Sequence, residues 1–151
     1  MIDLISEPSG QIYVDLLRFG MQFCSSFSLT WRDQAQFNQS ANDIENILRP
    51  FLLRESYADE WPGTKLYDSK ARVCFYRLTD RSLEILLRPS SLYAWLEPDL
   101  PEDLALYKTD GSCWLLSIAH ELDSAISDEQ ISITSLRTAV PGVAAIVHEK
   151  P

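Results

Sequence analysis

Hydrophobic and polar residues alternate over about a dozen positions in the first quarter of the chain. Between Phe19 and Trp31 the odd positions are mostly large and apolar, whereas the even positions are mostly small or polar. This period of two predicts a long strand with one buried face. A second segment, from Lys70 to Thr79, has apolar residues on both sides and therefore predicts a central strand.

A period of three to four residues predicts a helix in the segment that follows the first strand. The apolar spacing begins after Ser40, and Pro50 should end the helix near Leu48, because proline removes a helical N–H and clashes with the preceding turn. Capping residues at the start and Pro or Gly at the end predict helices over 80–87 and 127–138. Proline-containing segments also predict short turns over 61–64 and 90–96.

The pair Asp110-Gly111 lies between two apolar runs, which is typical of a two-residue type I′ hairpin turn. Counting outward from this turn places Tyr107 opposite Trp114 as a cross-strand aromatic pair. A last edge strand is expected over 143–147. Together these elements predict one α+β domain over 1–151, with a mainly antiparallel sheet of four to six strands and two or three helices on one side.

The chain of 151 residues is 46% apolar and carries a net charge of −9. Such an acidic balance argues against binding to nucleic acids or to anionic membranes, which require a basic face. The charge is also local, because residues 97–129 contain one base, Lys108, and nine acids: Glu97, Asp99, Glu102, Asp103, Asp110, Glu121, Asp123, Asp128 and Glu129. These acids have two interpretations. They form a solvated face, with some of them at the starts of helices, or they form a negative surface that binds a basic partner.

The three cysteines are widely spaced and odd in number, which suits buried free thiols in a reducing cytosol better than disulfides. The first eight residues have neither the basic nor the apolar segment of a secretory signal, and the longest apolar run is too short to span a membrane. We therefore expect a cytoplasmic protein.

Candidate catalytic chemistry centres on His120, followed by Glu121. On a regular strand His120 shares a face with Trp114 and Ile118, which favours a residue at the edge of the core, and Cys113 points to the opposite face. Asp99, Glu102 and Asp103 suit either a divalent cation or a rigid acidic loop between prolines, and the loop is the stronger interpretation. We expect no catalytic residue, metal or cofactor.

Several segments together resemble a group of small uncharacterised bacterial cytosolic proteins. The segments are Trp61-Pro62-Gly63-Thr64, the run 92–104 that ends in Pro-Glu-Asp-Leu, then Tyr107, Asp110-Gly111, and the run 114–121 that contains Ser-Ile-Ala-His-Glu. The resemblance covers residues 61–121 and implies a bacterial source and a compact α+β fold, and it assigns no catalytic residue. In size and charge the chain is also similar to immunity proteins of contact-dependent or secreted toxin systems.

The leading hypothesis is a non-enzymatic immunity protein that neutralises a toxin, such as a basic nuclease, by covering its basic groove over about 1,200–2,000 Å². The expected contacts are the acids of the 98–110 region and an aromatic anchor: Trp95, Glu97, Asp99, Glu102, Asp103 and Asp110. One alternative is a small hydrolase or metal-dependent enzyme that uses His120 and Glu121, which requires His120 to lie open beside a carboxylate. Another is a regulatory scaffold.

Overall fold

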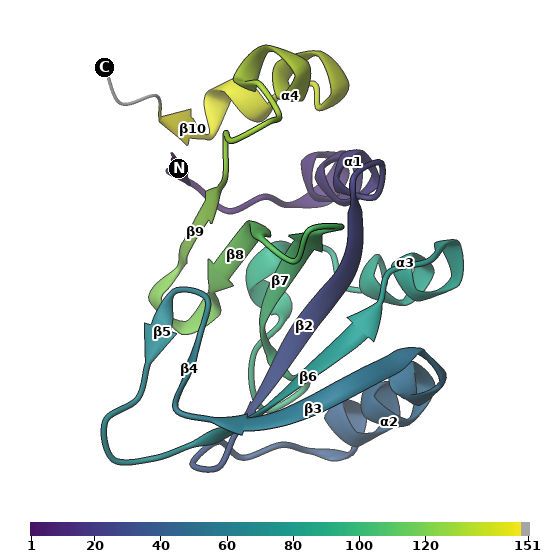
Figure 1. The fold of residues 1–151 in the computed structure, drawn as a ribbon, viewed down its shortest axis with the longest axis vertical. Helices are drawn as coiled ribbons and strands as arrows, with labels where there is room; N and C mark the ends of the chain where they lie inside the picture. The colour runs from purple at the N-terminus through teal and green to yellow at the C-terminus, as the bar shows by residue number, and fades with distance from the viewer. Residues whose placement is uncertain (149–151) are drawn as a thin grey trace.

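The computed structural model describes residues 1–148, and its centre is an eight-stranded antiparallel sheet (Figure 1). The strands are β1 (Ile2–Leu4), β2 (Cys24–Arg32), β3 (Leu52–Ala58), β6 (Ala71–Arg77), β7 (Glu102–Lys108), β8 (Cys113–Ile118), β9 (Asp123–Ile126) and β10 (Val147–His148). Their order across the sheet is β10-β1-β9-β8-β7-β2-β6-β3. The short strands β4 (Glu60–Trp61) and β5 (Thr64–Lys65) form a separate hairpin.

Four α-helices accompany the sheet: α1 (Gly10–Gly20), α2 (Gln39–Leu48), α3 (Asp80–Leu86) and α4 (Ile133–Ala139). Single 3-10 turns are η1 (Arg49–Phe51), η2 (Leu92–Ala94), η3 (Ala119–Glu121) and η4 (Val143–Ala145). Pro50 lies in η1, so α2 ends at Leu48 as predicted, although its N-cap is Asn38 and not Ser40.

The predicted α+β class with a mainly antiparallel sheet is confirmed, but several details of the prediction are wrong. The sheet has eight strands and not four to six, and the part of the chain that the structure describes holds four α-helices and not two or three. The long strand expected from Phe19 begins at Cys24, because α1 continues through Gly20. The helix expected from Ser127 begins at Ile133, with Ser132 as its N-cap.

The β7–β8 hairpin differs from the prediction by one residue. Lys108 and Ser112 are bonded across a three-residue loop, with Gly111 at a φ of 88°, so the turn is not the two-residue type. Tyr107 therefore pairs with Cys113, and the next pair is Leu106 with Leu115, which leaves Trp114 in a bulge. The expected Tyr107–Trp114 pair is wrong.

The two faces of the sheet are covered differently. One face packs against helices α1 to α3 and η2, and its core includes Phe27, Leu29, Tyr76, Leu106 and Leu115. The other face holds a second, smaller cluster of Trp61, Ala71 and Val73, which the β4–β5 hairpin covers. Figure 1 shows this hairpin in front of the lower left of the sheet. We call residues 59–70 the strap.

Candidate functional site

The strap is fixed to the sheet at its turn. Gly63 has a φ of 86°, and a Cβ atom there would lie 3.0 Å from the side chain of Ile118 and 3.2 Å from that of Leu116. The predicted Trp-Pro-Gly-Thr turn thus requires glycine for two reasons, its positive φ and its close approach to β8. This contact holds the strap over the start of β7 and the end of β8.

A β-bulge under the strap brings two carboxylates together. Ser28 pairs with Ala105 and Thr30 with Glu102, so β7 uses one residue more than β2 between these pairs. Asp103, within this interval, has a φ of 58°, in the left-handed region. In a regular strand Glu102 and Asp103 point to opposite faces, but here both carboxylates bond to residues at the strap end of the sheet.

Each of the two buried carboxylates has its own hydrogen-bond donors. Arg32 Nη2 donates to Glu102 Oε1 over 2.9 Å and also lies 3.6 Å from Glu97 Oε1. Asp103 accepts bonds from Trp61 Nε1 of the strap at 2.8 Å and from the Ala119 N–H at 3.0 Å. Burial raises the pKa of both carboxyl groups, and the donors oppose this effect without cancelling it. The cluster joins the strap, η3 and β2 to one point on β7.

His120 lies at the margin of this cluster, on η3, with its side chain 42% exposed. Its Nε2 atom is 3.8 Å from Glu121 Oε1, and one ligand atom each of Glu102, Asp103 and His120 fit within 4.8 Å of one another. His120 does not share a strand face with Trp114 and Ile118 as expected, because the Trp114 bulge and η3 interrupt the alternation. An enclosed His120 would have excluded the enzyme hypothesis, and the observed exposure does not.

Burial raises the pKa of all three cysteine thiols. All three are free thiols; Cys24 and Cys74 are buried, as the sequence predicts, and Cys113 is partly buried. Burial raises the pKa of the Cys113 thiol to about 11, so it is protonated at neutral pH.

Of the six residues expected to contact a partner, three are buried. Trp95 is fully buried in the core, where its Nε1 donates to Tyr13 Oη, and Glu102 and Asp103 have exposures of 0% and 1%. The expectation that these three residues are accessible is therefore wrong. The cause is the bulge for the two acids and the seating of η2 against the core for Trp95.

The remaining three residues lie at opposite ends of β7. Glu97 and Asp99 lie together and bond to Gln36 and Asn38 of the loop after β2. Asp110 lies in the turn at the far end of β7, a strand of seven residues, and therefore roughly 20 Å away.

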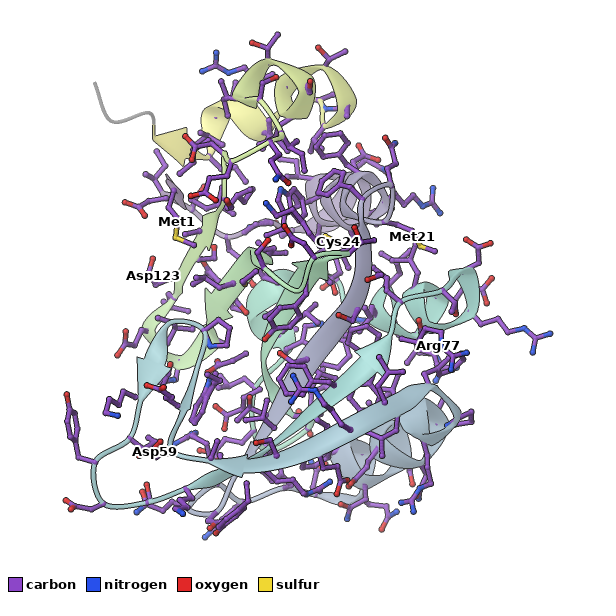
Figure 2. The ribbon with its side chains drawn as sticks, in the orientation of Figure 1. Met1, Met21, Cys24, Asp59, Arg77 and Asp123 are labelled. Atoms are coloured by element: carbon purple, nitrogen blue, oxygen red, sulfur yellow. The ribbon has the colours of Figure 1, made fainter. Side chains whose placement is uncertain are left out.

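A different set of acids gathers where Glu97 and Asp99 lie, and it includes Asp59 and Asp123, which are labelled on the left of the molecule in Figure 2. Strand register places the ends of β2, β3 and β8 and the starts of β6, β7 and β9 at one end of the sheet. We call this the acidic end, because the loops there carry eight acids that are exposed or half-buried: Asp33, Asp59, Glu60, Asp68, Glu97, Asp99, Glu121 and Asp123. In the described chain the basic residues of these loops and strand ends are Arg32, Lys65 and Lys70.

Two large apolar side chains are exposed in the same loops. Tyr67 of the strap is 86% exposed, and Leu122, between η3 and β9, is 71% exposed. No sequence pattern indicated either residue as part of a site, and none indicated that Arg32 and Trp61 contact the buried acids. The Trp-Pro-Gly-Thr turn was a signal for the strap, but nothing local indicated which strands it would cross.

No helix in the described part of the chain has the length and apolar character needed to cross a membrane. Comparisons with protein-family models, with curated proteins and with solved structures find no match to this chain.

Proposed function

We propose that the protein is a non-enzymatic binding protein of the immunity type, which neutralises a basic toxin domain by covering it with the acidic end. The observation that carries this proposal is the gathering of eight acids from four separate segments of the chain, against the three Lys and Arg residues Arg32, Lys65 and Lys70. Such a field accelerates the approach of a positively charged partner and selects against a negative one.

The exposed apolar residues support the same surface. An interface needs desolvated anchors as well as charge, and aromatic residues surrounded by polar groups commonly provide them. Tyr67 follows the β4–β5 hairpin and precedes Asp68, and Leu122 stands between Glu121 and Asp123. Tyr67 thus replaces the buried Trp95 as the proposed aromatic anchor.

Basic residues at the acidic end are already engaged, which leaves the acids in excess. Arg32 is paired with Glu102, and Lys65 Nζ lies 3.6 Å from Glu60 Oε2 and 4.0 Å from Asp59 Oδ2. Lys70 Nζ lies 5.8 Å from the centre of the Tyr57 ring. A partner that brings lysine or arginine side chains would therefore meet unneutralised carboxylates.

The test is co-expression with the product of the neighbouring gene, followed by native mass spectrometry for a complex and by an assay of protection. The informative variant is Asp68→Lys/Glu121→Lys/Asp123→Lys, because all three residues are exposed at the acidic end. The matched control is Asp110→Lys/Asp128→Lys/Glu129→Lys, which changes the charge equally but at exposed positions in two other loops, the β7–β8 turn and the segment after β9.

The triple reversal at the acidic end should weaken the complex at least tenfold and remove its salt dependence, whereas the control should retain both. Equal effects of the two variants would contradict the proposed surface. Absence of a complex and of protection would contradict the proposed function.

A further inference from the structure

The buried carboxylates under the strap and the exposed histidine beside them form a group that the proposed binding function does not use. We propose that Glu102, Asp103 and His120 form a binding site for a divalent cation. The first support is geometric, because one ligand atom from each residue lies within 4.8 Å of the other two. Two ligand atoms bound to one zinc ion lie roughly 3–4 Å apart, so the three groups lie near the spacing that one ion requires.

The charge balance of the buried group favours a cation. Glu102 and Asp103 are both buried, and Arg32 is the guanidinium that Glu102 contacts. Arg32 Nη2 is also 3.6 Å from Glu97 Oε1, so Glu102 shares its positive charge with a third carboxylate. Buried negative charge that is not matched is costly, and a divalent ion compensates for it.

A buried hydroxyl gives the second, independent support. Thr30 is 0% exposed, and its Oγ1 has no hydrogen-bond partner among residues 1–148. Thr30 is the cross-strand partner of Glu102, so the two side chains share one face of the sheet. Buried polar atoms are normally satisfied, and an oxygen in this position suits a cation or a water molecule bound to it.

The existing hydrogen bonds are compatible with a bound ion. A carboxylate oxygen has two lone pairs, so Asp103 can keep its bonds from Trp61 and Ala119 while it binds a metal. Arg32 can move from Glu102 toward Glu97, which is already near. One imidazole nitrogen with two carboxylates is a ligand set for Zn²⁺ or Mn²⁺ more than for Ca²⁺, which prefers oxygen ligands throughout.

A purely structural role of the cluster makes a different prediction about His120. If Asp103 serves only to hold Trp61 and Ala119, His120 is dispensable and metal has no effect. The probe is MnCl₂ added to the full chain after treatment with EDTA, followed by electron paramagnetic resonance and thermal unfolding. Manganese is chosen because thiolates bind it poorly, so the three cysteines do not compete.

The wild type should bind Mn²⁺ and show a higher Tm in its presence, since a ligand that binds the folded state stabilises it. His120→Ala should bind at least tenfold more weakly while its metal-free Tm stays unchanged, because the side chain is 42% exposed. Glu121→Gln is the matched control and should bind as the wild type does. Asp103→Asn, which keeps an acceptor oxygen but loses the charge, should also lose binding.

No Mn²⁺ binding by the wild type, or equal binding by the wild type and His120→Ala, would overturn the proposal. Because the readout needs no protein partner, its failure is distinguishable from failure of the immunity function.

Discussion

The helix-covered face of the sheet and the strap-covered face are built from different chemistry. The first is filled by fully buried large side chains, among them Trp95, Trp114 and Tyr13. The second has a small apolar cluster around Trp61 and, next to it, the buried carboxylates of Glu102 and Asp103. Within residues 1–148, buried polar atoms without a partner occur on both faces, at Thr30 on the second and at the indole nitrogens of Trp31 and Trp114 on the first, so the buried carboxylates are what distinguish the two. Apolar burial on the first face stabilises the fold, whereas the buried polar groups on the second face lower the free energy of unfolding. Such local exceptions to good packing are where function is expected.

The largest predicted difference is between two tryptophans, one from each face. Trp95→Ala should lower the free energy of unfolding by about 3–5 kcal/mol, because a fully buried indole leaves a cavity in the main core. Trp61→Ala should cost less, about 1–3 kcal/mol, because the strap can lift and admit water to Asp103. Urea unfolding measures both costs.

Hydrogen exchange distinguishes local opening of the strap from disruption of the main core. In Trp61→Ala, exchange should accelerate in β4 and β5 and stay slow in β2 and β6, since local opening is sufficient. If Trp61→Ala lowers the free energy of unfolding as much as Trp95→Ala does, or more, then the strap is part of the main core and the two faces do not differ in this way.

The sequence indicated the helix-covered face far better than the strap-covered one. Alternation at Phe27, Leu29 and Trp31 and the stop at Pro50 are local signals. The strand covers these three residues and α2 ends at Leu48 as predicted, although the strand begins at Cys24 and not at Phe19. The burial of Glu102 and Asp103 depends on a bulge and on the strap, which starts about 40 residues earlier in the chain. Two adjacent acids after a proline are typical of an exposed loop, so no local pattern predicts that Arg32 and Trp61 meet them.

On the strap-covered face, Asp103 should make the free energy of unfolding depend on pH. Because burial raises the pKa of Asp103 above its ordinary value of 3.8, the folded state holds a proton that the unfolded state has released. This group therefore contributes stability at acid pH, and the contribution is lost as the pH rises through the folded-state pKa. Asp103→Asn does not titrate, so the wild type should lose stability relative to this variant as the pH rises from 3.8 through the folded-state pKa of Asp103.

Urea unfolding in the presence of EDTA measures this slope without interference from metal. Asp123→Asn, an exposed position at the same end, is the control and should leave the slope as in the wild type. A difference between the wild type and Asp103→Asn that is constant over the whole range would mean that Asp103 is ionised throughout, and that its donors outweigh its burial.

The smallest predicted effect distinguishes two exposed acids of the acidic end from an exposed acid far from it. At the acidic end the acids outnumber the bases and repel one another, so Asp68→Asn/Asp123→Asn should raise the Tm by about 1–2 °C at low ionic strength. Asp110 behaves differently, because it accepts bonds from the Ser112 N–H and hydroxyl that lower the pKa of its carboxyl group. Asp110→Asn should therefore lower the Tm. Added salt should reduce the gain at the acidic end, where it arises from long-range repulsion, and leave most of the loss at Asp110, where it arises from short hydrogen bonds. If Asp68→Asn/Asp123→Asn lowers the Tm instead, the acids of that end are satisfied by internal pairs, and they are not available to a basic partner.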